Sequence, residues 1–240
     1  MKIEVWSDFV CPFCYIGKRR LELALEKFDN KDNVLVEYKS YELDPHAEKN
    51  PGKSIHELLA GKYNISVEKA RSMNENVGEQ AAEVGLTYHF ETMQHTNTFD
   101  AHRLAKYAAK QGKGKEMTEK LLYAYFTESK LISDRTTLAD LAEEVGLEKE
   151  PVLEVLETDK YANHVRNDEE TATQIGVQGV PFFVFNEKYA VSGAQPPEVF
   201  SEVLEKVWEE EKEKPILQSL NPKTSKTTYC TDDGCVEEDK

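Results

Sequence analysis

The spacing of apolar residues changes period twice within the first forty positions. Residues 2–9 have the apolar and aromatic composition of a buried strand. From about Pro12 the apolar positions recur every three or four residues, as on one face of an amphipathic helix that ends near residue 30. Residues 34–38 again have the composition of a strand. This order predicts the start of an α/β unit.

The middle of the chain, from about Ser54 to Glu157, has helical periodicity and no convincing strand pattern. Four glycines follow apolar-periodic stretches, where a helix often ends in a left-handed residue: Gly61, Gly85, Gly112 and Gly146. Asn97 precedes a helix expected to run to about Lys110, and Pro151 suits a first helical position. We predict an all-helical insertion here.

After the insertion, residues 161–175 are predicted to form a helix closed by Gly176, and residues 182–185 and 189–192 a hairpin. A last helix is expected from Pro196 to about residue 211. This order of elements predicts an α/β thioredoxin fold with an inserted all-helical domain. The expected parts are the thioredoxin domain in two segments (1–45 and 160–212), the insertion (46–159) and a flexible C-terminal tail (213–240).

Composition and charge narrow the class of protein. The 240-residue chain has a formal net charge of -15. An acidic surface repels phosphate backbones and anionic headgroups, so neither nucleic acid nor a membrane is an expected partner. No apolar run approaches the roughly 18 residues that span a bilayer. Glu4 and Asp8 interrupt any secretory signal core, so we expect a cytoplasmic protein.

The four cysteines form two local pairs at opposite ends of the chain, Cys11 with Cys14 and Cys230 with Cys235. Pairs of this kind suggest redox chemistry or metal binding more than a disulfide scaffold. Cys11 lies where the first strand ends and a helix begins, and a helix N-terminus stabilises a thiolate. We therefore expect Cys11 to attack, and Cys14, one turn further on, to resolve the mixed disulfide.

A second signal is Pro181, between a turn at Gly179 and an apolar strand. A proline there cannot continue a central ladder. A cis bond between Val180 and Pro181 would place the loop against the cysteine pair and leave a backbone edge for a substrate. The alternative is an ordinary trans proline at the start of a strand.

Together these features resemble the DsbA-like branch of the thioredoxin superfamily, most closely its FrnE-like members. Four stretches carry the resemblance: residues 5–14, 97–103, 179–184 and 191–195. The resemblance implies a cis-proline loop at Pro181 facing Cys11, and a helical insertion covering the site. It assigns catalysis to Cys11, Cys14 and Pro181, and substrate binding to Val180, Phe13 and His102.

Two related groups keep an alternative open. The kappa-class glutathione transferases and the hydroxychromene-carboxylate isomerases are similar in layout but carry serine where Cys11 stands. With both cysteines present, disulfide exchange is favoured over glutathione-dependent isomerisation or transfer. One departure from the wider superfamily is Val5, six residues before Cys11, where a buried acid is common. Glu4 or Asp8 is a conceivable substitute as proton acceptor.

Cys230 and Cys235 flank an Asp-Asp-Gly turn, which suits a local disulfide. A flexible tail of this length has a reach of roughly 23 Å, so we hypothesise that this pair exchanges with Cys11–Cys14 as a redox relay or regulator. The alternatives are a surface pair without function and a non-enzymatic zinc-binding module with all four cysteines as ligands. We expect no cofactor and no metal, and protein or low-molecular-weight thiol or disulfide substrates. The direction of electron flow and the oligomeric state stay open.

Overall fold

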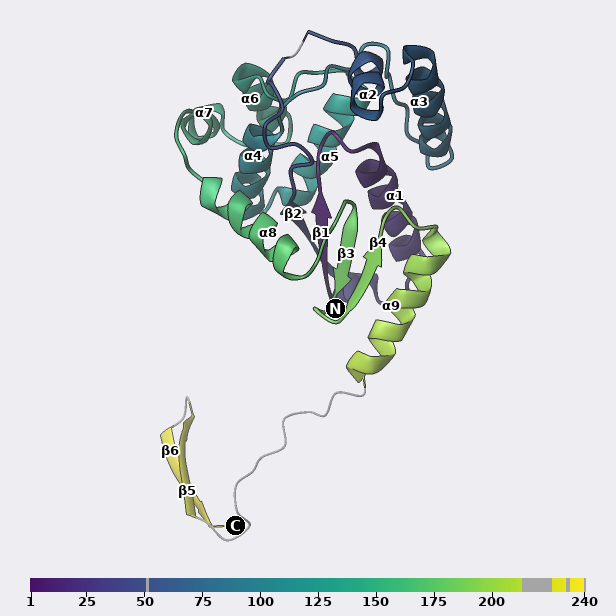
Figure 1. The fold of residues 1–240 in the computed structure, drawn as a ribbon. Helices are drawn as coiled ribbons and strands as arrows, with labels where there is room; N and C mark the ends of the chain where they lie inside the picture. Colours follow the sequence, from purple (N-terminus) through teal and green to yellow (C-terminus); the bar gives the residue numbers. More distant parts are fainter. Residues whose placement is uncertain (51, 213–225, 232–233, 240) are drawn as a thin grey trace. The chain divides into compact units, whose positions relative to one another are not determined.

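The computed structural model describes residues 1–50, 52–212, 226–231 and 234–239, the last two ranges by their backbone. Four strands form one mixed sheet in the order β2-β1-β3-β4. Their bounds are β1 (Lys2–Ser7), β2 (Leu35–Ser40), β3 (Phe182–Phe185) and β4 (Tyr189–Ser192). β1 pairs parallel with β2 and antiparallel with β3, which pairs antiparallel with β4 (Figure 1). The predicted α/β fold is confirmed.

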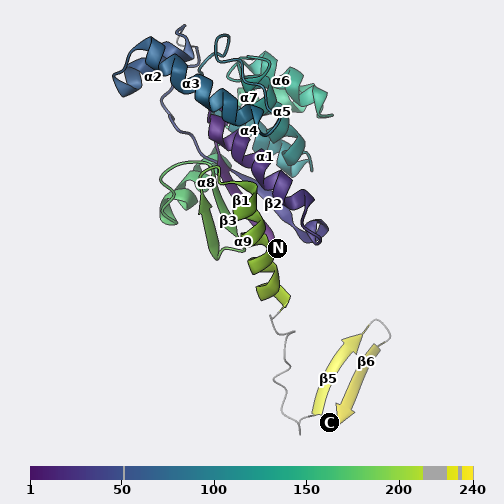
Figure 2. The same cartoon turned by 90° about the vertical axis from the view of Figure 1, so that its right-hand side faces the viewer.

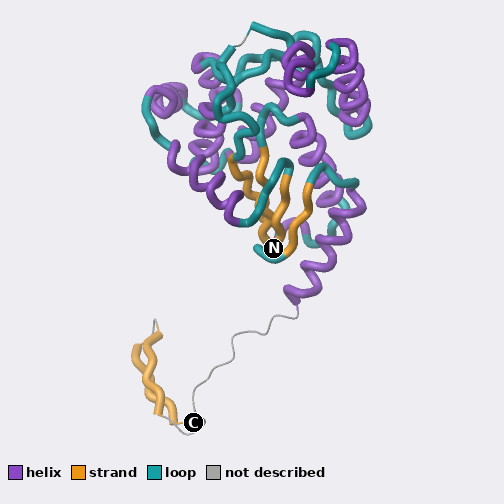
Figure 3. Tube along the Cα trace, viewed as in Figure 1, coloured by secondary structure: helices purple, strands orange, loops and turns teal. Residues whose placement is uncertain are grey.

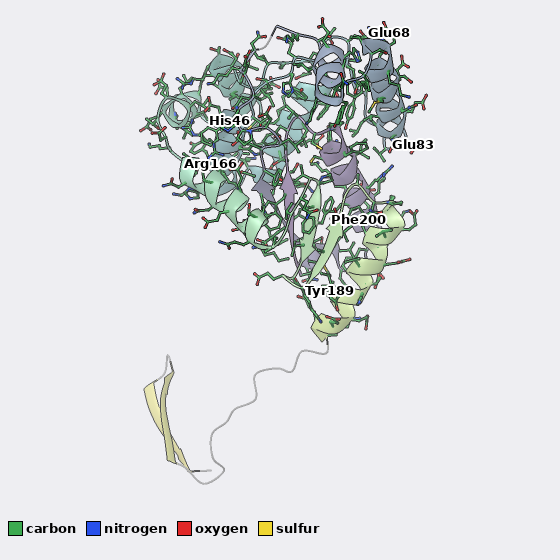
Figure 4. The ribbon with its side chains drawn as sticks, in the orientation of Figure 1. His46, Glu68, Glu83, Arg166, Tyr189 and Phe200 are labelled. Carbon is green, nitrogen blue, oxygen red and sulfur yellow. The ribbon has the colours of Figure 1, made fainter. Side chains whose placement is uncertain are left out.

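Helices cover both faces of this sheet: α1 (Pro12–Glu26) and α9 (Pro197–Lys212) on one, α8 (Ala162–Gln174) on the other. The alternation of side chains along β1 explains the two layers. Val5 points into the core that α1 and α9 share, whereas Trp6 packs on Ala172 of α8. Phe200 of α9, labelled in Figure 4, meets Phe183 of the sheet with ring centroids 4.8 Å apart.

The residues between β2 and α8 form the predicted helical insertion. Figures 2 and 3 show its helices gathered at the end of the sheet where β1 leads into α1. Their core includes Phe9, Tyr15 and Ile16, so the insertion packs directly on the segment that carries the first cysteine pair. The bounds are α2 (Ile55–Tyr63), α3 (Val67–Ala82), α4 (Phe99–Lys110), α5 (Gly114–Phe126), α6 (Arg135–Glu144) and α7 (Lys149–Glu157).

Three predicted helix boundaries are wrong. Gly61 lies inside α2, and the left-handed residue that caps this helix is instead Asn64, with φ 52°. Pro151 is the third residue of α7 rather than the first, a position where its missing amide is also tolerated. The first helix, α1, ends at Glu26, before the predicted limit near residue 30, because a short 3-10 turn follows.

The remaining predicted helix boundaries lie close to the observed ones. Asn97 does assist the start of α4: Thr98 is the N-cap, and the Asn97 side chain accepts a hydrogen bond from the Phe99 amide at 3.0 Å. Four glycines at predicted helix ends adopt positive φ, as expected: Gly85, Gly112, Gly146 and Gly176.

Two compact units divide the chain, Met1–Trp208 and Glu209–Lys240. The first contains both the sheet and the helical insertion. In the second, β5 (Lys226–Thr231) pairs antiparallel with β6 (Gly234–Asp239). These strands lie within the expected tail, where threonine, tyrosine and valine favour extended backbone. The flexibility of the tail stays a prediction. Residues 213–225, and the turn residues expected at 232–233, lie outside the described residues.

None of the helices in the described part of the chain combines the length and the apolar character that a membrane span requires.

Candidate active site

Cys11 occupies the N-cap position of α1, with φ -91° and ψ 112°, and Pro12 follows as the first helical residue. The chain enters this position through a tight turn in which the Cys11 amide donates to the Asp8 carbonyl at 3.2 Å. The Cys11 sulfur lies 3.5 Å from the Val180 carbonyl oxygen. The free amides at the start of α1 favour a negative charge on the adjacent sulfur.

Cys14 lies one turn further along α1 and is almost fully buried, with 2% of its surface exposed. Both cysteines are free thiols. The Asp8 amide donates to the Cys14 sulfur at 3.4 Å. Burial raises the pKa of the Cys14 thiol well above its ordinary value, and the neighbouring Cys11 raises it further. Cys14 therefore stays protonated near neutral pH.

The loop that contains Pro181 packs against α1 near Gly17. The Val180–Pro181 bond is cis, as the resemblance implied. The Pro181 carbonyl accepts a hydrogen bond from the Gly193 amide at 2.8 Å. A Cβ atom on Gly17 would come within 3.0 Å of Pro181 and 3.2 Å of the Phe183 ring. Glycine at position 17 thus allows the close approach of α1 and the loop, a role that the sequence analysis missed.

A cleft of about 780 Å³ opens beside Cys11, and we call it the active-site cleft. Its far side is formed by α2 and α3, and its lining is mainly apolar. Cys14 is not among the residues that border it. Several lining side chains are partly open to solvent, including Phe13 at 38% and Met73 at 39%. The principal lining residues are Asp8, Cys11, Phe13, Leu43, Leu58, Leu59, Tyr63, Met73, Val77, Phe90, Met93 and His95.

Asp8 and His102 form a buried polar contact beside the Cys11–Cys14 pair. Asp8 is 1% exposed, and its carboxylate accepts hydrogen bonds from the Phe9 and Leu43 amides, each at 2.8 Å. His102 of α4, 2% exposed, places Nε2 3.2 Å from Asp8 Oδ1. This contact joins residues 94 positions apart in the sequence.

Glu42 is a third buried titratable residue, near His102. Its side chain is wholly enclosed and pairs with Arg166 of α8, labelled in Figure 4, at 2.5 Å. Its other oxygen, Oε1, has no hydrogen-bond partner among the described residues. Burial raises the pKa of Glu42, although Arg166 and the nearby His102 oppose the shift. Three titratable side chains therefore lie enclosed behind the cysteine pair.

A second hollow, of about 560 Å³, lies on this far side and is called the rear cavity. Ser7, Phe9 and His102 line it together with residues of β2, α4 and the start of α5, and with Tyr161 and His164 at the start of α8. Asp8 borders the active-site cleft and His102 borders the rear cavity. The Asp8–His102 contact thus stands between the two hollows.

Tyr88, which the sequence analysis did not single out, anchors the start of α1. Its hydroxyl donates to the Pro12 carbonyl at 2.8 Å, and its ring stacks on Phe126 at 4.4 Å between centroids. Further along α1, the buried Lys18 binds Glu119 of α5, which also pairs with Arg19. These contacts hold the cysteine-bearing turn against the insertion.

The predicted site residues divide into three groups. Cys11, Cys14 and Pro181 lie together, with Phe13 on the cleft and the Val180 carbonyl at the Cys11 sulfur. His102 contacts Asp8 and lines the rear cavity instead of the active-site cleft, and its role in substrate binding stays a prediction. Cys230 and Cys235 are Cα partners in the register of β5 and β6, while their side chains lie outside the described residues.

Two further histidines of the insertion, His89 and His95, have different surroundings from His102. His89 contacts the Thr127 carbonyl at 2.7 Å, and His95 lines the active-site cleft. No group of three or more histidine, cysteine, aspartate or glutamate side chains within the described residues has the arrangement of a metal site.

Residues 2–205 match the family model described as the DSBA-like thioredoxin domain. The chain belongs to this DsbA-like family. Its FrnE-like position within the family stays a prediction. Among curated proteins it is 28% identical over 204 residues to the uncharacterized protein YwbO of Bacillus subtilis (strain 168), covering 84% of this chain and 94% of that one.

Several solved structures share this fold. A protein described as a probable DsbA oxidoreductase, SCO1869 from Streptomyces coelicolor, is 39% identical, with a TM-score of 0.87 and 98% of each chain covered. A 2-hydroxychromene-2-carboxylate isomerase is 12% identical, with a TM-score of 0.66, covering 90% and 100%. The cytosolic disulfide reductase DsbM from Pseudomonas aeruginosa is 15% identical, with a TM-score of 0.60, covering 87% and 99%. The last two likenesses concern the fold alone.

Proposed function

We propose that this DsbA-like chain is a protein disulfide oxidoreductase that exchanges disulfides through a mixed disulfide on Cys11. The observation that carries the proposal is the contrast between the two sulfurs. Cys11 caps a helix and borders the active-site cleft, whereas Cys14 is enclosed and its thiol is held protonated by burial. An incoming disulfide meets Cys11 first.

The exchange proceeds in two displacements. The Cys11 thiolate attacks one sulfur of a substrate disulfide, forms the mixed disulfide and releases the first substrate thiolate. Cys14 then loses its proton and attacks Cys11, which forms the Cys11–Cys14 disulfide and releases the second substrate thiolate. The reverse sequence transfers the disulfide to a dithiol substrate. The Val180 carbonyl and the Phe13 ring lie where a bound substrate chain passes the sulfur.

Single cysteine variants test the proposal. Cys11→Ser is expected to abolish exchange with a peptide disulfide, because the nucleophile is lost. Cys14→Ser is expected to keep the first displacement and to accumulate a mixed disulfide visible by mass spectrometry. Exchange that survives in the Cys11→Ser protein would refute the proposal.

Protein thiols and glutathione are the substrate classes to compare. The DsbM neighbour has also been solved with GSH. The isomerase neighbour keeps glutathione-dependent isomerisation as the second candidate, since its fold covers 90% of this chain. Isomerisation leaves the redox state of Cys11–Cys14 unchanged, whereas a single round of exchange with a disulfide oxidises the pair. A count of the protein's free thiols before and after one round therefore distinguishes the two reactions.

We further propose that Cys230–Cys235 exchanges with the Cys11–Cys14 pair as a redox relay. Directly opposed residues of an antiparallel pair have Cα atoms about 4.5–5.5 Å apart, within the range of a disulfide. The test is a Cys14→Ser protein in which Cys11 lacks its own partner. Absence of any Cys11–Cys230 or Cys11–Cys235 species by mass spectrometry would sink the relay, and zinc found by metal analysis would favour the alternative of a zinc site with four cysteine ligands.

A further inference from the structure

The rear cavity carries a charge opposite to that of the molecule as a whole. The chain has a formal net charge of -15. The residues that line the cavity nevertheless include one carboxylate residue, Glu37, and four lysines: Lys39, Lys106, Lys110 and Lys115. An anion that the acidic surface repels elsewhere is therefore attracted at this place.

Two of the four lysines are available to a ligand. Lys39 already pairs with Glu37, and Lys106 pairs with Asp168 of α8. The other two, Lys110 at the end of α4 and Lys115 at the start of α5, form no ion pair with any residue in the described part of the chain. Their charges are thus left to bind an anion from solution.

The turn between α4 and α5 supplies backbone donors beside these lysines. Gly112 has a φ of 74°, and Gly114 is the first residue of α5. The N-cap residue, Lys113, makes no side-chain hydrogen bond to the first amides of this helix, which also have no acceptor within it. Both glycines line the cavity. A helix N-terminus that follows glycine and lies beside lysine is a favourable environment for phosphate.

Thr118, one turn further along α5, is an independent sign of a ligand. It is 2% exposed and lines the cavity, yet its hydroxyl forms no hydrogen bond with any of the described residues. Buried hydroxyls normally have a partner. Thr118 lies four positions after Gly114, so both residues are on the same side of the helix.

The open edge of β2 supplies a second set of polar groups. β2 ends the strand order, and its residues line the cavity. The Leu35 amide donates to Met1, so Val36 and Tyr38 direct their backbone groups towards the other, unpaired edge. The Tyr38 carbonyl on that edge accepts a hydrogen bond from Lys106 at 3.0 Å. The Val36 carbonyl and the Tyr38 amide remain side by side as an acceptor and a donor.

We propose that the rear cavity binds a mononucleotide. The phosphate lies between Lys110, Lys115 and the first amides of α5. The base lies along β2, because a nucleobase has a neighbouring donor and acceptor on one edge that match the Val36 carbonyl and the Tyr38 amide. The volume of about 560 Å³ is within the range of small-molecule sites. This site is separate from the active-site cleft, and the inference does not depend on the proposed function.

A peptide strand is the other kind of ligand that an open strand edge binds. On β2, two side chains already occupy part of that edge. Lys106 donates to the Tyr38 carbonyl, and Asp168 accepts the Ser40 amide at 2.7 Å. The stretch left free is too short for a paired strand, which favours a small ligand.

Isothermal titration calorimetry with AMP, UMP, ribose 5-phosphate and inorganic phosphate tests the proposal. We expect AMP or UMP to bind with a Kd below about 100 µM. Ribose 5-phosphate, which lacks the base, and inorganic phosphate should each bind at least about tenfold more weakly.

Variants of the cavity locate the site. Replacing both Lys110 and Lys115 by glutamine should weaken nucleotide binding about tenfold or more, because charge-assisted hydrogen bonds are lost. Thr118→Val should weaken it about fivefold, and Thr118→Ser, which keeps the hydroxyl, should restore it. Lys113→Gln is the matched control, since Lys113 lies in the same turn but pairs with Glu116 at 3.7 Å and is not among the lining residues.

Three results would overturn the inference: no nucleotide bound with a Kd below about 1 mM, ribose 5-phosphate or inorganic phosphate bound as tightly as the nucleotides, or an equal loss in Lys113→Gln. Lys110 and Lys115 are exposed, so their double variant decides the question if Thr118→Val does not fold. The Cys11→Ser protein should bind the nucleotide unchanged, so failure of the proposed function would leave this result intact.

Discussion

The side chains on the two sides of the Cys11–Cys14 pair differ in polarity and in exposure to solvent. Towards the active-site cleft, the lining is mainly apolar, and side chains such as Tyr63 and Met73 are 54% and 39% exposed. Asp8, which also borders the cleft, and His102 and Glu42 beyond it are charged or titratable and almost fully enclosed. Charge is thus kept inside the fold and apolar surface is left outside, the reverse of the usual distribution.

This contrast separates two tasks. An exposed apolar surface binds varied substrates by non-directional contact, and methionine adapts its shape to different partners. The enclosed polar side has fixed partners, and each of its groups costs free energy to bury. Changes on the enclosed side should therefore alter stability or the handling of protons, whereas changes in the cleft should alter substrate binding alone.

The largest expected effect is on the enclosed side, at Arg103, the neighbour of His102 on α4. Its guanidinium binds Asp100 at 2.7 Å and donates to the carbonyls of Val155, Thr158 and Lys160. Arg103→Met removes the buried cation from Asp100, which keeps only the largely exposed Lys49, and takes this donor from three carbonyls. The expected cost is about 3–5 kcal/mol in the free energy of unfolding. Urea unfolding measures it. Arg71→Met, at an exposed pair with Glu91, should cost less than about 1 kcal/mol.

The next effect is in the cleft, at Met73 of α3. Met73→Glu places a charge among the apolar lining residues, and we expect about a tenfold fall in kcat/KM for a disulfide peptide with leucine or phenylalanine beside its cysteine. The rate with a serine-flanked peptide should change little. Val67 is the matched control, since it lies on the same helix with 38% exposure against 39% for Met73. If Val67→Glu lowers the rate equally, the apolar cleft is not the binding surface.

Sequence reasoning predicted the parts of this contrast that depend on local pattern. The change of period at Pro12 predicted the helix that Cys11 caps, and the apolar run after Pro181 predicted β3. Local pattern also explains the failure at Gly61, since a glycine is tolerated inside α2. The strands β5 and β6 were not expected, although β-branched residues in an acidic, polar stretch still favour paired strands.

The enclosed side could not be predicted in the same way, because it is assembled from distant segments. Asp8 and His102 are 94 positions apart, and the sequence around each residue does not predict their contact. The sequence showed only that Asp8 lies three residues before Cys11, and this position alone suggested a proton acceptor without identifying its partner. The cleft depended equally on how α3 packs against α1 and α2 against α3, which periodicity along each helix does not specify.

The smallest expected effect is on the pH dependence of stability, and it distinguishes Glu42 from the other enclosed charges. Burial raises the folded-state pKa of Glu42 above its unfolded value of about 4.3. The stability that Glu42 contributes is therefore fully present below that pH and is lost as the pH rises through the folded pKa. Glu42→Gln removes this loss, so its free energy of unfolding, relative to the unmodified protein, should increase between pH 4 and pH 8. Glu169→Gln, which removes the other carboxylate bound to Arg166, is the control in the same urea titrations. If the two variants show the same dependence on pH, the effect belongs to Arg166 and its surroundings, and the enclosed position of Glu42 carries no cost of its own.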